Sequence, residues 1–172
     1  TGGFLSLHAV GTTGILFAHE YAGFKVANPV GLVVAAVFAL ASGFVDLRPS
    51  FAPLVVRHRA ALRRAVLVAL VVWFVVTVVE LPPLHKPGSE GGSQSVLAVL
   101  AGFGALAYAV AAARYWYVYR GRLSLLPASV IACFILLAEA MVGVALTGER
   151  AWHASWWEWH GLIVTAYAVV SY

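Results

Sequence analysis

The sequence predicts an all-α membrane protein whose single domain, residues 1–172, is a bundle of six transmembrane helices. Two observations predict this fold class. Apolar and aromatic residues make up 62% of the chain and charged residues only 10%, and the mean hydropathy is +0.90. Soluble domains average roughly 45–50% apolar and about 25% charged residues. This composition excludes a cytosolic enzyme, a nucleic-acid-binding module and a disordered chain.

Six apolar stretches divide the chain at approximately 4–22, 29–45, 65–81, 95–118, 125–146 and 156–172. Each approaches the roughly 20 residues that a helix needs to cross the hydrocarbon core of a bilayer. Backbone groups in lipid must be paired within their own segment, so we expect each stretch to be a helix. The first stretch has the lowest helix propensity, because it contains Gly11 and Gly14.

The cationic residues predict the orientation of the bundle. The loops after the second and fourth stretches hold eight of the eleven Lys and Arg residues, namely Arg48, Arg57, Arg59, Arg63, Arg64, Arg114, Arg120 and Arg122. Cytoplasmic loops carry the excess of positive charge, so both loops and both chain ends are predicted to be cytoplasmic. The partner of this basic rim would then be the anionic surface of the lipid bilayer and not a nucleic acid.

In that orientation, imidazole and carboxylate groups gather near the outer face. All six glutamates and four of the six histidines lie there, including His19, Glu20, His153, Glu158 and His160. Polar groups at membrane depth usually face the interior of the bundle and mark a function. Imidazole also binds zinc, copper and iron.

Spacing singles out the first and sixth stretches. His8 and His19 are eleven residues apart, and His153 and His160 are seven apart, so each pair lies about 20° from one face of a continuous helix. His19 and His160 both lie at the outer ends of their stretches. We therefore expect them to meet if these two helices are neighbours.

Two imidazoles from facing helices provide the axial ligands that a b-type haem needs. On these histidines the chain loosely resembles the membrane b-type cytochromes, which hold haem through histidines on transmembrane helices. The resemblance implies haem ligation by His19 and His160, with His8 and His153 as substitutes. In architecture alone, the layout also resembles the six-helix membrane anchors of bacterial signalling enzymes such as nucleotide cyclases.

A bare copper, iron or zinc ion is the alternative to haem b. Its ligands would be His19 and His160, with Glu20, Glu158 or Glu139 orienting the imidazoles as hydrogen-bond acceptors. Glu139 lies several residues inside the fifth stretch, where an unpaired carboxylate is expected to be neutral because the charged form is poorly solvated.

The leading hypothesis is a redox or sensory module in a bacterial inner membrane, with no enzymatic activity of its own. Motifs for phosphate binding, zinc peptidases and serine nucleophiles are missing from the sequence. A cytoplasmic output domain or other membrane subunits are the expected protein partners. Two alternatives stay open, which are a small proton- or cation-coupled transporter and a cofactor-free structural subunit of a larger membrane complex.

Overall fold

The structure is a computed structural model that describes residues 2–11, 16–17, 21–47, 51–82, 90–122, 124–147 and 154–171. All secondary-structure elements of the described residues are helices, which confirms the all-α fold class. In chain order they are α1 (Gly2–Val10), α2 (Ala22–Gly43), the 3₁₀ turn η1 (Val45–Leu47), α3 (Phe51–Arg57), α4 (Arg59–Val78), α5 (Glu90–Tyr119), the 3₁₀ turn η2 (Arg120–Arg122), α6 (Leu125–Thr147) and α7 (Ala154–Ser171).

Among the described residues, four helical segments are long and apolar enough to cross a membrane. They are Ala22–Gly43, Arg59–Val78, Leu97–Arg122 and Leu125–Leu146. These segments indicate a membrane protein, because a soluble globule could not cover so many long apolar helices. The helix α2 begins at Ala22, earlier than the predicted start at residue 29, and it contains Pro29 within its length. Membrane helices tolerate such a proline when neighbouring groups satisfy the freed carbonyl.

The helix predicted over residues 4–22 is shorter in the structure. It ends at Val10, Gly11 follows in a turn, and Tyr21 has an extended backbone. A side chain on Gly11 would collide with the ring of Phe24, so the chain turns where glycine allows this close approach. At about 1.5 Å per residue, the nine residues of α1 are too short to cross a bilayer.

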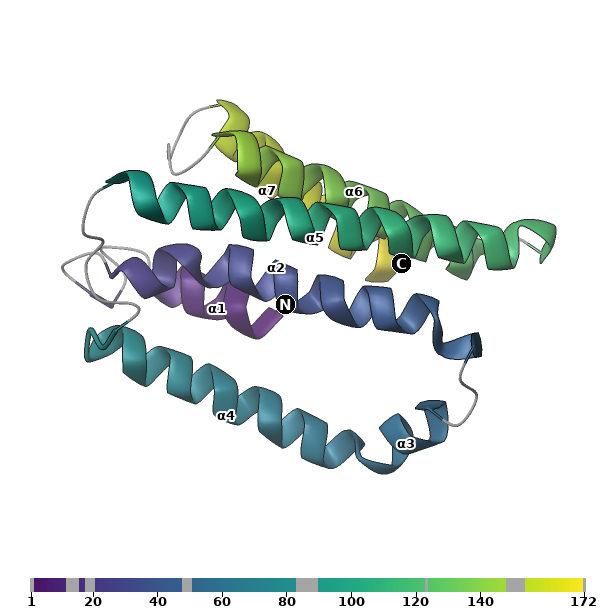
Figure 1. The fold of residues 1–172 in the computed structure, drawn as a ribbon, viewed down its shortest axis with the longest axis horizontal. Helices are drawn as coiled ribbons and strands as arrows, with labels where there is room; N and C mark the ends of the chain where they lie inside the picture. Colours follow the sequence, from purple (N-terminus) through teal and green to yellow (C-terminus); the bar gives the residue numbers. More distant parts are fainter. Residues whose placement is uncertain are drawn as a thin grey trace.

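The tightly packed part of the bundle consists of α2, α5, α6 and α7 (Figure 1). The helix α5 packs against both α2 and α6, and α6 packs in turn against α7. Small side chains line these contacts, among them Ala36, Ala101, Ala111, Ala140 and Ala166, each without exposed surface. Small residues allow membrane helices to approach closely, which increases their van der Waals contact.

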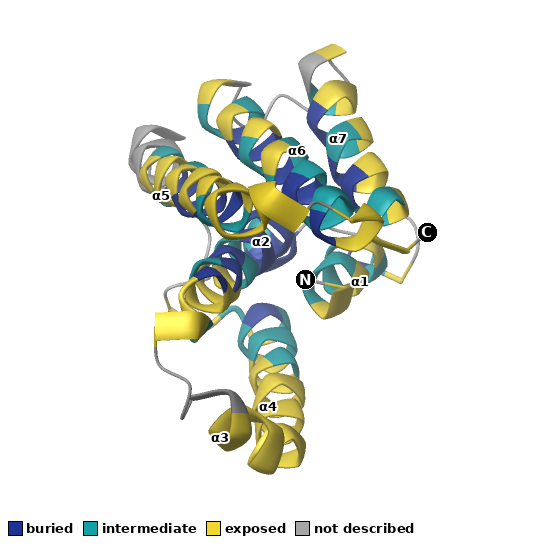
Figure 2. Ribbon diagram, turned by 90° about the vertical axis from the view of Figure 1, so that its right-hand side faces the viewer, coloured by how far each residue is buried: buried dark blue, intermediate teal, exposed yellow. Residues whose placement is uncertain are grey.

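The helix α4 stands apart from this bundle. Of the long helices it is the least buried, as its exposed colouring in Figure 2 shows, with 6% of its apolar window buried against 44% for α2. It touches α2 and α1 near one end only, where Trp73 donates a hydrogen bond to the carbonyl of Gly23 over 3.1 Å. Along most of its length, α4 therefore has little contact with the other long helices.

The two Arg-rich connections lie at the same end of the molecule (Figure 1). Arg114, near the end of α5, donates a 2.6 Å hydrogen bond to Asp46 of η1 and so joins the connections after α2 and α5. Its guanidinium also lies 5.5 Å from the ring centroid of Phe44. This clustering agrees with the charge asymmetry on which the predicted orientation rests.

Candidate functional site

Two imidazoles from opposite ends of the chain meet inside the molecule. His8 of α1 and His160 of α7 have ring centroids 6.4 Å apart, with an angle of 33° between the ring planes. Both side chains are half-buried. The sequence predicted that His19 meets His160. His19 lies outside the described residues, and the histidine that lies near His160 in the structure is His8.

Main-chain carbonyls hold both rings. His8 bonds through Nδ1 to the carbonyl oxygen of Phe24 on α2 at 2.9 Å, and His160 bonds through Nδ1 to that of Trp156 at 2.7 Å. A carbonyl only accepts hydrogen bonds, so each Nδ1 must carry the proton. In a neutral ring Nε2 then carries the lone pair, which is the protonation state that metal ligation through Nε2 requires.

The sequence predicted that Glu20, Glu158 or Glu139 orients the histidines, and the acceptors found at the two Nδ1 atoms are main-chain carbonyls. Glu158 precedes His160 by two residues, which places its side chain on a different side of α7, roughly 200° away. The carbonyl of Trp156, one turn earlier on the same helix, is the partner of His160 Nδ1. That a glutamate orients the histidines stays a prediction.

Two tryptophans cover the ring of His160. The ring centroids of Trp156 and Trp159 lie 3.8 Å and 3.6 Å from its centroid. Trp159 is 7% exposed and belongs to the packed interior. Neighbouring aromatic rings fix the position of an imidazole and lower the local polarity, which strengthens electrostatic interactions at the site.

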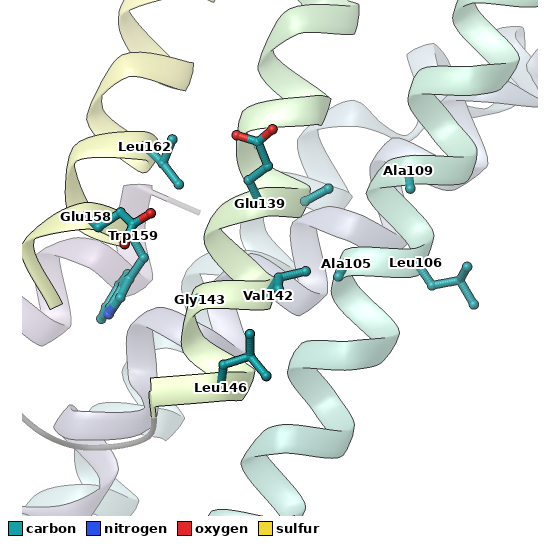
Figure 3. A pocket seen from close by; sticks show the side chains of 11 residues that line it. Ala105, Leu106, Ala109, Glu139, Val142, Gly143, Leu146, Glu158, Trp159 and Leu162 are labelled. Atoms are coloured by element: carbon teal, nitrogen blue, oxygen red, sulfur yellow. The ribbon is translucent and has the colours of Figure 1, made fainter. Parts of the chain in front are cut away.

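Glu139 and Glu158 lie in a different place, a groove formed by α5, α6 and α7 (Figure 3). Both carboxylates are exposed, and the groove has a volume of about 730 Å³. The remaining lining is almost entirely apolar, as with Leu106, Val142 and Leu162. The predicted set of ligands is thus divided, with two histidines inside the bundle and two glutamates on this groove.

Three residues of the predicted site, His19, Glu20 and His153, lie outside the described residues. Within the described part of the chain, no three His, Cys, Asp or Glu side chains come together as a metal site would require. Among the described residues, the candidate ligands for a bound group are therefore the two imidazoles of His8 and His160.

Sequence reasoning missed three buried polar groups. The carboxamide of Asn28, the hydroxyl of Thr77 and the indole N–H of Trp159 are all buried and have no hydrogen-bond partner among the described residues. Leaving such a group unpaired costs about 1–3 kcal/mol. A signal was present for Asn28, because it is an isolated amide in an apolar helix directly before Pro29.

In comparisons with protein-family models, curated proteins and solved structures, no match to this chain was found.

Proposed function

We propose that this protein is a membrane-embedded redox or sensory module that holds a transition-metal centre, as haem b, between His8 and His160. The observation that carries the proposal is the 6.4 Å separation of the two rings, each with Nδ1 on a carbonyl. Two imidazoles that bind one metal from opposite sides, with each nitrogen about 2.0–2.1 Å from the metal, have ring centroids roughly 6 Å apart.

The number of ligands favours haem over a bare ion. Haem iron takes its remaining ligands from the porphyrin, so two axial imidazoles complete its coordination. A structural zinc ion takes four protein ligands and a catalytic one three. Within the described residues only the two imidazoles are available, so a bare copper, iron or zinc ion is the less favoured occupant.

The proposed setting is a bacterial inner membrane, with both Arg-rich connections on its cytoplasmic side. The shared end of the two Arg-rich connections supports this orientation. With that orientation, the histidine pair lies toward the outer half of the bilayer. Electrons or a conformational signal would pass from there to a cytoplasmic output domain or to neighbouring membrane subunits.

An absorption spectrum of the purified protein in detergent tests the proposal. We expect a reduced-minus-oxidised α-band typical of a bis-imidazole haem, lost in His160→Gly and in His8→Gly and regained when free imidazole is added. His58→Ala is the matched control, because His58 is exposed at the start of α4 and should leave the spectrum unchanged. A wild-type protein without haem and without bound metal would contradict the proposal.

The groove with Glu139 and Glu158 favours a second candidate, a proton- or cation-coupled transporter. Carboxylates at membrane depth commonly mark ion pathways, and here both line one groove. Cation or proton flux into liposomes that contain the wild-type protein, abolished by Glu139→Gln, would support this candidate. Leu106→Gln, a change to an amide elsewhere on the groove, is the control that should retain flux.

A further inference from the structure

Small side chains form the groove of about 730 Å³ between α5, α6 and α7 (Figure 3). Ala105 and Ala109 line it on α5, and Ala138 and Gly143 line it on α6. Larger side chains at these positions would fill the hollow. Its volume is within the range of roughly 300–1,000 Å³ that binding sites for small molecules have in proteins.

Two carboxylates line this groove from adjacent helices. Glu139 lies within the apolar segment Leu125–Leu146 of α6, and Glu158 lies near the beginning of α7. Among the described residues, no Lys, Arg or His lines the groove. Ionised carboxylates there have no cation of the groove lining to balance their charge, and such an arrangement is costly at membrane depth.

Three kinds of occupant fit this lining to different extents. The acyl chain of a lipid would cover the apolar walls but would leave both carboxylates unpaired. A bare metal ion needs further ligands, and no three His, Cys, Asp or Glu side chains come together among the described residues. An organic cation with an apolar body would cover the walls and balance the carboxylates at the same time.

We propose that this groove binds an apolar organic cation, which is an ammonium or phosphonium ion with alkyl or aromatic substituents. Its positive centre lies beside Glu139 and Glu158, and its substituents pack against apolar side chains such as Val142 and Leu162. The inference is independent of the histidine pair. It rests on the groove of the second candidate function, the transporter, and deepens that function by naming the class of substrate.

Equilibrium binding of tetraphenylphosphonium to the purified full chain in a non-ionic detergent tests the inference. Tetraphenylborate, an anion of the same shape, is the matched probe that lacks the positive charge. We expect saturable binding of the cation and none of the anion. Glu139→Gln and Glu158→Gln should each weaken binding of the cation about tenfold, because each removes one nearby negative charge. Binding is measured without flux, so a protein that binds the cation but does not transport it supports the inference.

Asp46→Asn is the matched control for charge, because Asp46 is also acidic but lies in η1, outside the groove. Ala109→Phe tests the hollow itself, since the added ring fills the groove and should abolish binding while both carboxylates remain. Val99→Phe is its control, because Val99 lies on the same helix, is 72% exposed and does not line the groove. Protection of the buried Cys133 thiol, the only cysteine of the chain, verifies that each variant is folded.

Several results would overturn the inference and leave the histidine pair unaffected. A wild-type protein that binds no tetraphenylphosphonium is the most direct. Equal affinity for the cation in the wild-type protein and in the double variant Glu139→Gln/Glu158→Gln would show that the carboxylates do not hold it. Equally strong binding of tetraphenylborate would identify apolar adsorption alone. Displacement of the probe by phosphatidylethanolamine would assign the groove to a lipid headgroup instead of a free cation.

Discussion

The helices α2 and α4 are similarly long and apolar, yet they are used in opposite ways. Most of the buried residues of α2 are glycine or alanine, as with Ala27, Gly31 and Ala36. By contrast, α4 carries many valines that face away from the bundle, and Val68, Val71 and Val72 are each more than half exposed. As a result α2 is buried among α1, α4 and α5, whereas α4 touches the bundle near one end.

This difference shows that hydrophobicity alone does not pack helices in a membrane. Lipid tails solvate valine as well as a protein interior does, so burial of α4 would gain little free energy. Close approach is what stabilises helix contacts, and small residues allow it. The exception on α4 is its end near Thr77, which fits against Gly23 because glycine has no side chain.

The largest expected difference in stability is between Leu→Ala substitutions at one position on α2 and one on α4. Leu32→Ala on α2 removes a fully buried side chain and should reduce the free energy of unfolding by at least about 2 kcal/mol. Leu67→Ala on α4, where the side chain is 61% exposed, should change it by less than about 0.5 kcal/mol. Thermal unfolding in detergent, followed by reaction of the Cys133 thiol, measures both.

Equal losses in the two variants would mean that α4 is as tightly packed as α2. A stability loss in Leu32→Ala that is smaller than the loss in Leu67→Ala would mean that the contact between α2 and α5 is looser than the structure indicates.

A hydrogen bond within the packed region should have the next largest effect. The hydroxyl of Tyr108 on α5 donates to the carbonyl of Leu32 over 3.0 Å, and both groups are buried. Tyr108→Phe should therefore lower stability by about 1 kcal/mol. Tyr117→Phe is the control, because Tyr117 is exposed. The same unfolding measurement decides, and equal stability of Tyr108→Phe and wild-type protein would refute the expectation.

Loss of the hydrogen bond that joins α4 to α2 should have a smaller effect on stability, confined to α4. Trp73→Phe keeps an aromatic ring against Phe4 but loses the hydrogen bond to Gly23. We expect the free energy of local opening of α4 to fall by less than about 1 kcal/mol, so its amides exchange faster with deuterium. Exchange in α5 and α6 should not change. Trp116→Phe, at an exposed position, should leave exchange unchanged. Faster exchange across the whole chain would show that α4 supports the bundle globally.

The smallest effect is expected at the basic end. Asp46 is half exposed, so its ion pair with Arg114 is screened by solvent. Asp46→Asn should cost about 0.5 kcal/mol or less at low salt and nothing at high salt. Unfolding temperatures of both proteins across a salt series provide the measurement. A large loss that persists at high salt would identify this pair as a structural anchor.

The helices could be predicted from the sequence because their signal is local. Long apolar runs, the glycines near Gly11 and the arginines after α2 and α5 are all readable along the chain. The broken first helix was anticipated only as weak propensity, since its end depends on contact between Gly11 and Phe24. Likewise, the hydrogen bond between His160 and the carbonyl of Trp156 has no signal in the sequence, since any residue type at position 156 supplies a carbonyl.

By itself, the sequence determined that this chain is helical, strongly apolar and charged mainly at one end, because composition and spacing act through nearest neighbours and through the surrounding solvent. Only the tertiary structure decided that His8 approaches His160, that the buried Asn28 has no hydrogen-bond partner among the described residues, and that α4 stays at the margin. These outcomes depend on which helices can approach closely. Close approach depends on the side-chain shapes of helix faces that are far apart in the sequence. Local hydropathy carries no information about those shapes.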